Sequence, residues 1–134
     1  MSERLLDRIE SPADVRALPR EQVEALCCEL RDEIVQRVAK TGGHLASSLG
    51  AVELITVIHH VFDTPTDRLV LDVGHQGYAH KLLTGRRGVF DRIGKQGGIG
   101  KFLRREESRF DHFGAGHAGT SISAALGIAR AKQH

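Results

Sequence analysis

Aromatic residues and cysteine are scarce in this sequence. Its 134 residues include five phenylalanines, one tyrosine and no tryptophan, so the hydrophobic core must be built from leucine, isoleucine, valine and alanine. The two cysteines, Cys27 and Cys28, are adjacent in a predicted helix and therefore face different directions. We expect both to be reduced thiols in a cytoplasmic protein.

Long apolar runs and a strong excess of one charge are also missing. No run reaches the length that spans a membrane, and the first residues lack the apolar segment of a secretory signal. The formal net charge of +2 is too small to predict nucleic-acid binding, and no aromatic ladder accompanies the basic residues. We therefore expect a globular protein with neither membrane nor nucleic acid among its partners. Its length is that of one domain.

The apolar residues that are present recur mostly at helical spacing. Four glycines between 94 and 100 favour a flexible loop over 88–100, although Val89, Phe90 and Ile93 would allow one or two helical turns. The predicted helices are a short one that begins at Ser11-Pro12, then 19–40, a helix capped by Ser47 or Ser48 that ends near Phe62, then 78–83 and 120–132.

Only one segment has the composition of a strand. Leu69-Val70-Leu71 is aliphatic and of strand length, and we predict a strand over 69–72. A lone strand cannot form a sheet, so the remaining strands must come from elsewhere. The chain is therefore expected to be the incomplete, mostly helical part of a larger α/β domain.

Three glycine-containing blocks carry side chains or backbone groups that could bind a ligand or transfer protons. The predicted strand leads into Asp72-Val73-Gly74-His75-Gln76, and ligands gather at the carboxyl ends of strands in open α/β sheets. His44 lies in a second loop, where an imidazole can bind oxygens and move protons near neutral pH. The third block, Gly116-His117-Ala118-Gly119-Thr120-Ser121, precedes a helix whose N–H groups favour anions. Taken singly, each block is also explained as a turn with surface histidines.

Two other polar clusters carry less information. The histidine pairs His75/His80 and His112/His117 are each five residues apart, which does not place two ligands on one helical face, so we expect no zinc site. His59 and His60 are neighbours and diverge on a helix, where one should pack and the other face solvent. The charge run 104–107 is explained as well by solvated surface as by a functional role.

Taken together, the blocks resemble those of the 1-deoxy-D-xylulose-5-phosphate synthases, thiamine-diphosphate enzymes of the transketolase type. The resemblance covers nearly the whole chain but only the opening part of the family's much longer one. It implies that residues 1–134 are the N-terminal part of the diphosphate-binding, three-layer α/β domain. The blocks that match in order are Thr41-Gly42-Gly43-His44-Leu45-Ala46-Ser47-Ser48-Leu49-Gly50, the stretch 69–85 with Tyr78, His80, Lys81, Thr84 and Gly85, Arg105-Glu106-Glu107-Ser108 with Asp111, and 116–121.

The resemblance also implies roles for individual residues. His44 would be an acid–base and substrate-contacting residue, and His75 a catalytic residue that also contacts the cofactor. Gly116, His117 and Ala118 would bind the cofactor. Family members commonly have Ser-Ser where this chain has Ala118-Gly119, so the resemblance carries over contacts through the backbone there and not contacts through hydroxyls.

The implied reaction condenses pyruvate with glyceraldehyde 3-phosphate and releases carbon dioxide. The product feeds isoprenoid, thiamine and pyridoxal phosphate synthesis. The resemblance implies thiamine diphosphate and Mg²⁺ as cofactors, the remainder of the enzyme as a partner, and a homodimer. The family's Gly-Asp-Gly segment, whose Asp holds the magnesium, is not found in these 134 residues, so we assign no metal ligand and expect this segment alone to be inactive. A transketolase-type subunit and a non-catalytic truncated module are the alternatives.

Overall fold

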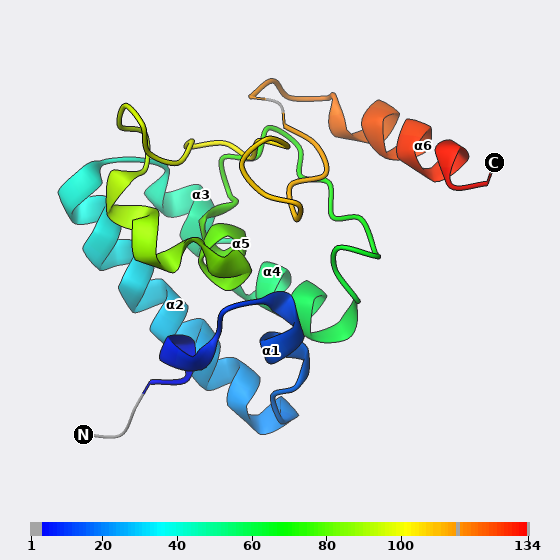
Figure 1. Ribbon diagram of the computed structural model, residues 1–134. Coiled ribbons are helices and arrows are strands. Elements are labelled where there is room, and N and C mark those ends of the chain that lie inside the picture. The colour runs from blue at the N-terminus through cyan, green and yellow to red at the C-terminus, as the bar shows by residue number, and fades with distance from the viewer. Residues whose placement is uncertain (1–3, 115, 134) are drawn as a thin grey trace.

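The regular secondary structure of the described residues is entirely helical. The computed structural model describes residues 4–114 and 116–133, and these residues contain no strand (Figure 1). The elements in chain order are the 3-10 helix η1 (Leu5–Arg8), the helices α1 (Pro12–Arg16), α2 (Arg20–Thr41), α3 (Leu45–Leu49), α4 (Val52–Val61) and α5 (Tyr78–Lys81), the π-helical segment η2 (Leu82–Arg86), the 3-10 helix η3 (Arg87–Arg92), and α6 (Ser121–Ala131).

Helix α2 is the long element against which the others pack. Its predicted extent and apolar stripe are confirmed: the helix follows Pro19 and ends at Gly42, whose φ of +68° suits glycine. η1, α3, α4, α5 and η3 all contact it. The core consists of aliphatic side chains with Tyr78 and Phe90, as the composition requires, and its α2 members are Leu26, Cys27, Leu30, Ile34 and Val38. Cys27 is buried while Cys28 is exposed, so the two thiols do face different directions, and both are free.

The first predicted helix start is also confirmed. Ser11 precedes Pro12, the first residue of α1, and the carboxylate of Asp14 accepts bonds from the Ser11 N–H at 2.8 Å and from the Ser11 hydroxyl at 3.0 Å. A proline at this position has no N–H to satisfy, and the carboxylate complements the positive end of the helix. The pairing fixes where the chain turns toward α2.

The single helix predicted from Ser47 or Ser48 to Phe62 is wrong. Two helices are present, α3 and α4, and the chain leaves helical geometry at Ala51, where φ is −111° and ψ is 2°. Both serines lie inside α3 rather than at its start. Their hydroxyls bond the carbonyl of His75, which orients α3 independently of α4. His59, rather than Val61 or Phe62, takes the inward position at the end of α4.

The strand predicted over 69–72 is wrong for the described residues. Leu69, Val70 and Leu71 are half-buried in a connection between α4 and α5 that pairs with no other segment. An aliphatic run forms a strand only beside a second one, because its N–H and C=O groups need ladder partners. The helical content expected of this part of the chain is therefore confirmed, while α/β layering is not seen in it.

The region 87–100 is helical at first and irregular afterwards. The flexible-loop prediction fails for η3, because Phe90 is fully buried and holds that turn on the core. Turns follow from Ile93 onward, and Gly94 and Gly97 have positive φ. Gly85, with φ +80°, interrupts helical geometry where the α5 region was predicted to end.

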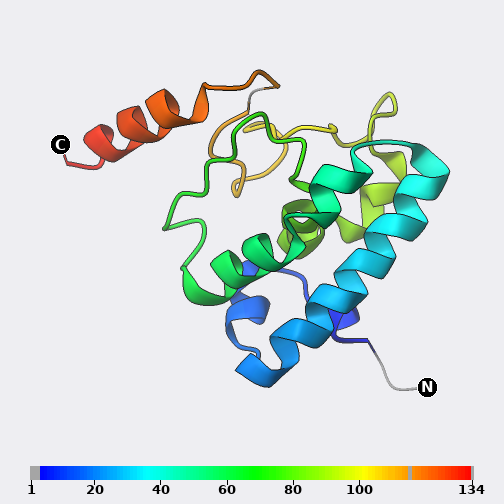
Figure 2. The same cartoon turned by 180° about the vertical axis from the view of Figure 1, so that it is seen from behind.

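Helix α6 stands apart from the body of the molecule. Its predicted range of 120–132 agrees with Ser121–Ala131, but none of its residues is buried. Both views show it extending away from the packed helices, and Figure 2 shows it across from α2 (Figures 1 and 2). The ammonium of Lys132 donates to the carbonyl of Thr66 at 2.7 Å. Within the described residues, no helix is long and apolar enough to cross a membrane.

Candidate functional site

Two loops bring the imidazoles of His44 and His75 together. His44 directly precedes α3, and His75 lies in the turn before α5. Their ring centroids are 5.9 Å apart, and the rings meet edge to face at 84°. The sequence gives no direct sign of this meeting, because 31 positions separate the two residues. Their convergence makes the pair the centre of the candidate site.

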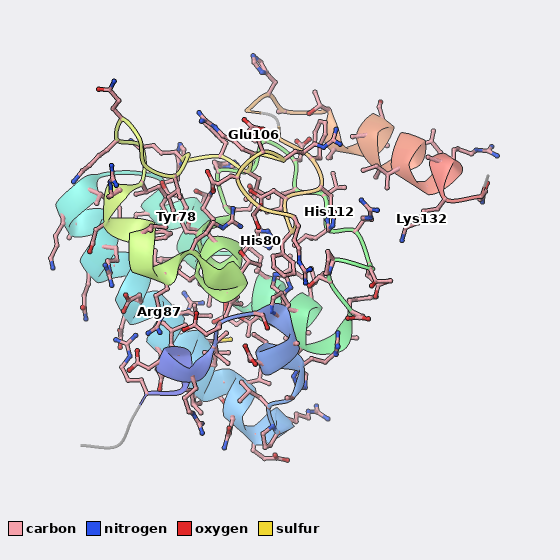
Figure 3. The ribbon with its side chains drawn as sticks, in the orientation of Figure 1. Tyr78, His80, Arg87, Glu106, His112 and Lys132 are labelled. Carbon is pink, nitrogen blue, oxygen red and sulfur yellow. The ribbon has the colours of Figure 1, made fainter. Side chains whose placement is uncertain are left out.

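Aromatic rings surround His44 on two further sides. The ring of Phe102 lies 5.2 Å from the His44 ring, and the ring of Tyr78 lies 6.1 Å from it. Tyr78 is the first residue of α5 (Figure 3). Phe102 comes from the loop that follows η3. These rings limit the water around His44 and leave the imidazole half-buried.

Hydroxyl groups of α3 fix the backbone beside His75. Ser47 and Ser48 both donate to the carbonyl oxygen of His75, at 3.3 Å and 3.2 Å. Ser48 is fully buried, so its bond forms away from competing water. Both serines belong to the block that begins at Thr41, and their spacing from His44 is fixed by α3. The two histidine loops are therefore joined by direct hydrogen bonds.

The electrostatic surroundings keep His44 neutral. Partial burial lowers the pKa of His44, and the nearby His75 and Lys101 lower it further because a second positive charge is unfavourable there. The Nδ1 atoms of His44 and His75 are both buried, and neither has a hydrogen-bond partner within the described structure. A buried polar atom without a partner is costly, and a bound polar ligand would satisfy it.

The block 116–121 is held by Asp72. The carboxylate of Asp72 accepts from the Gly119 N–H at 2.9 Å and 3.1 Å and from the Ser121 N–H at 3.1 Å. These bonds lower the pKa of Asp72. The anion at the start of α6 is thus a side chain of the same protein, three residues before His75. The block 116–121 lies next to the segment that carries His75.

The predicted cofactor-binding residues are accessible rather than enclosed. Gly116 is half-buried, and His117 and Ala118 are exposed. Within the described residues, no hydrogen bond joins the imidazoles of His44 or His75 to this segment. The unpartnered nitrogens of the two imidazoles fit a polar ligand, whereas the N–H groups of Gly119 and Ser121 already have an acceptor. Any diphosphate contact here would use the remaining, exposed part of 116–118.

A second polar cluster is buried in the molecule, and the sequence did not predict it as a unit. Nε2 of His80 lies 3.0 Å from the Asp111 carboxylate, Nδ1 of His80 lies 2.9 Å from Nε2 of His59, and Nδ1 of His59 lies 2.9 Å from the Thr64 hydroxyl. Asp111 is ionised because Arg86 and His80 lower its pKa despite burial. Each neutral imidazole therefore donates toward Asp111 and accepts from the other side, which fixes both tautomers.

Arg86 extends this cluster into the charge run. It donates to Asp111 at 2.7 Å and 2.8 Å and to Glu107 at 2.8 Å, and Glu107 also pairs with the fully buried Lys81. The two carboxylates accept backbone N–H groups as well, from Gly100 and Arg104. Glu107 is thus structural, although its neighbour Glu106 is exposed as expected of solvated surface. The cluster holds the loop that carries Phe102.

The prediction for the two neighbouring histidines is half right. His59 is fully buried, whereas His60 is half-buried, and its Nδ1 donates to the Val15 carbonyl at 3.0 Å instead of facing solvent. No group of three or more histidine, cysteine or acidic side chains in the described part of the chain is arranged to hold a metal ion.

Comparison with known proteins agrees with the blocks described above. Residues 6–134 match the family model described as 1-deoxy-D-xylulose-5-phosphate synthase. Proteins of that name from Thiobacillus denitrificans, Anaeromyxobacter dehalogenans and Nitrosomonas europaea are 61%, 59% and 59% identical to this chain over 95%, 97% and 97% of its length. The chain spans about a fifth of these relatives, covering 21%, 20% and 22% of them.

Proposed function

Because the chain belongs to the 1-deoxy-D-xylulose-5-phosphate synthase family, we propose that it is the N-terminal part of an enzyme that condenses pyruvate with glyceraldehyde 3-phosphate, with loss of carbon dioxide. The family has a transketolase-like, thiamine-diphosphate-binding fold. The α/β layering belongs to the proposal, with its strands supplied by the remaining four-fifths of the relatives' length. The relatives' name favours this synthase over transketolase.

The observation that carries the proposal is the convergence of His44 and His75. Their rings lie 5.9 Å apart, and each has a buried Nδ1 without a partner. Two imidazoles at this spacing can contact one ligand from two sides. The surrounding Tyr78 and Phe102 rings exclude part of the solvent, which strengthens hydrogen bonds made inside the site.

We assign different roles to His44 and His75 within this proposal. The lowered pKa of His44 leaves its imidazole neutral at pH 7, so a ring nitrogen can accept a proton from a substrate hydroxyl and return it. His75, fixed through its carbonyl by Ser47 and Ser48, orients the bound molecule against His44. Gly116, His117 and Ala118 would contact the diphosphate of thiamine diphosphate, which supplies the carbanion chemistry that protein side chains lack.

The test is a comparison of histidine variants in a full-length synthase that carries this segment. His44→Ala and His75→Ala should each lower kcat by about a hundred- to ten-thousand-fold, the usual effect of losing a positioned acid–base. His60→Ala is the matched control, because His60 bonds the Val15 carbonyl away from the site. It should chiefly lower the melting temperature. Near-normal turnover of both site variants, at saturating cofactor and substrates, would contradict the proposal.

A further inference from the structure

We propose that Tyr78 is a positioning residue, which sets the separation of His44 and His75 through its hydroxyl group and its place in the chain. This inference rests on the function proposed above for the two histidines. Tyr78 has no part in that proposal beyond excluding solvent.

Tyr78 is held rigidly in the core. It is the first residue of α5 and is fully buried. Its ring meets the ring of Phe90 edge to face, with centroids 5.4 Å apart and an interplanar angle of 84°. Phe90 is itself fully buried and comes from η3. Close packing on a second buried ring leaves the phenol one position, because interiors have little free volume.

The hydroxyl of Tyr78 bears directly on the His44 loop. It accepts a hydrogen bond from the His44 N–H at 3.2 Å. A side chain at Gly43 would place its Cβ 2.4 Å from the same oxygen, so the loop rests on the phenol with no room between them. Gly43 also has a φ of +146°, which other residues rarely adopt. The backbone of His44 is therefore located by this one oxygen.

The position of Tyr78 in the chain links it to the other histidine. Only Gln76 and Gly77 separate Tyr78 from His75, and Gly77 packs closely on Leu103. The two loops are therefore joined at two points, by the Tyr78 hydroxyl at His44 and by the α3 hydroxyls at the His75 carbonyl. Removal of the Tyr78 hydroxyl leaves the His44 N–H without its acceptor and releases one of the two points.

The experiment replaces Tyr78 by phenylalanine in the full-length enzyme. We expect kcat to fall about 10- to 100-fold, as for a small misplacement of a reacting group. The acid limb of the pH–rate profile should also move toward the ordinary histidine pKa. Burial lowers the pKa of His44, and a loop released from Tyr78 would expose this imidazole to more water. Thr56→Val is the matched control. It removes another buried hydroxyl, one that donates to the Val52 carbonyl at 2.7 Å within α4.

The control should lower the melting temperature and leave kcat and the pH profile unchanged. Normal kcat and an unshifted profile for Tyr78→Phe, with His44→Ala inactive, would overturn this inference and leave the proposed function standing. A change in melting temperature alone would overturn it too. Near-normal turnover of His44→Ala would instead contradict the proposed function and this inference with it.

A second variant approaches the same contact from the other side. Gly43→Ala presses a methyl group against the Tyr78 oxygen and should lower kcat with the same shift in pH profile. The double variant with Tyr78→Phe lacks the oxygen that the methyl group would contact. Its fold-loss in kcat should therefore be smaller than the product of the fold-losses of the two single variants. Multiplicative losses would overturn the inference, and normal kcat for Gly43→Ala would overturn it even where Tyr78→Phe does not fold.

Discussion

The imidazoles of His59 and His80 lie nearly parallel in the interior, with an interplanar angle of 19° and 2.9 Å between Nε2 of one and Nδ1 of the other. Both side chains are fully buried. The shared hydrogen bond needs one donor and one acceptor, so it is lost when both rings are protonated, and burial disfavours a charge on either ring. Burial and the neighbouring His80 lower the pKa of His59 to about 3.

We predict that the buried His59 and His80 make the protein less stable in acid. A histidine whose pKa is depressed on folding binds fewer protons folded than unfolded, so its contribution is complete above the unfolded pKa of about 6.5 and is lost as pH falls toward about 3. Each proton involved changes the free energy of unfolding by about 1.4 kcal/mol per pH unit. His59→Gln keeps a donor and an acceptor without titrating.

Denaturant unfolding measured across this range tests the prediction. The slope of the free energy of unfolding against pH should be smaller for His59→Gln than for the natural sequence. Thr64→Val is the control, because it deletes the hydroxyl that bonds His59 and keeps the titrating ring. It should lower stability at neutral pH and retain the slope. An unchanged slope for His59→Gln would show that this histidine does not govern acid stability.

Glu107 is predicted to be essential to stability although it lies in a charge run. Glu107→Gln leaves the fully buried Lys81 without the carboxylate it pairs with, and removing one partner of a fully buried ion pair costs about 3–5 kcal/mol, an upper bound for this partly buried one. The adjacent Glu106→Gln is the matched control, because that side chain is exposed, and it should change stability by less than about 0.5 kcal/mol.

Rescue of this variant separates charge from packing. Lys81→Met combined with Glu107→Gln removes both charges and should be more stable than Glu107→Gln alone, since no uncompensated ammonium remains buried. Thermal melts of the three variants give the comparison. Equal melting temperatures for the Glu106 and Glu107 variants would contradict the role of the ion pair.

Asp72 is predicted to support cofactor affinity without touching the reacting atoms. Asp72→Ala removes the acceptor of the Gly119 and Ser121 N–H groups and loosens the segment that carries Gly116, His117 and Ala118. Calorimetric titration of the full-length enzyme should show weaker binding of thiamine diphosphate, with kcat at saturating cofactor nearly unchanged. Asp32→Ala, on the exposed surface of α2, is the control. Unchanged binding by Asp72→Ala would contradict this role, and tighter binding would indicate that the freed N–H groups themselves hold the diphosphate.

The 134 residues as an isolated polypeptide are predicted to show no synthase turnover. They span about a fifth of their relatives and, within the part that the structure describes, offer no group of side chains arranged to hold a metal. An assay for the sugar phosphate product, with thiamine diphosphate, Mg²⁺ and both substrates, should find none, whereas a complete relative should form it. Product formation by this polypeptide would refute the expectation that further domains are needed.

Local patterns predict those features that neighbouring residues decide. The spacing of Leu26, Leu30, Ile34 and Val38 is enough to predict α2, because every fourth residue of a helix lies on one face. The start of α1 follows from Ser11 and Pro12 in the same way. His44 and His75 could be singled out by their glycine-containing loops and by the resemblance of their blocks to a known family.

Features that depend on residues distant in the sequence could not be predicted from local patterns. Leu69 to Leu71 form no strand because their surroundings supply no second strand. Lys81 and Glu107 are 26 residues apart, and nothing in the charge run distinguishes the half-buried Glu107 from the exposed Glu106. The hydroxyls of Ser47 and Ser48 likewise bond the carbonyl of His75, which is 27 or more residues away in the sequence.

Helix α6 has a consequence for the strength of ligand binding. It is anchored near its ends, by Asp72 at one and by Lys132 at the other, while Ile122 and Leu126 remain exposed along it at 80% and 61%. A helix without buried residues opens locally at little cost, and its amide protons should exchange with solvent far faster than those of α2. Gly116, His117 and Ala118 precede this helix and would be displaced with it. Their apparent dissociation constant for any ligand is then the intrinsic one divided by the fraction of molecules in which the segment is in place, so whatever covers α6 would tighten ligand binding without contacting the ligand.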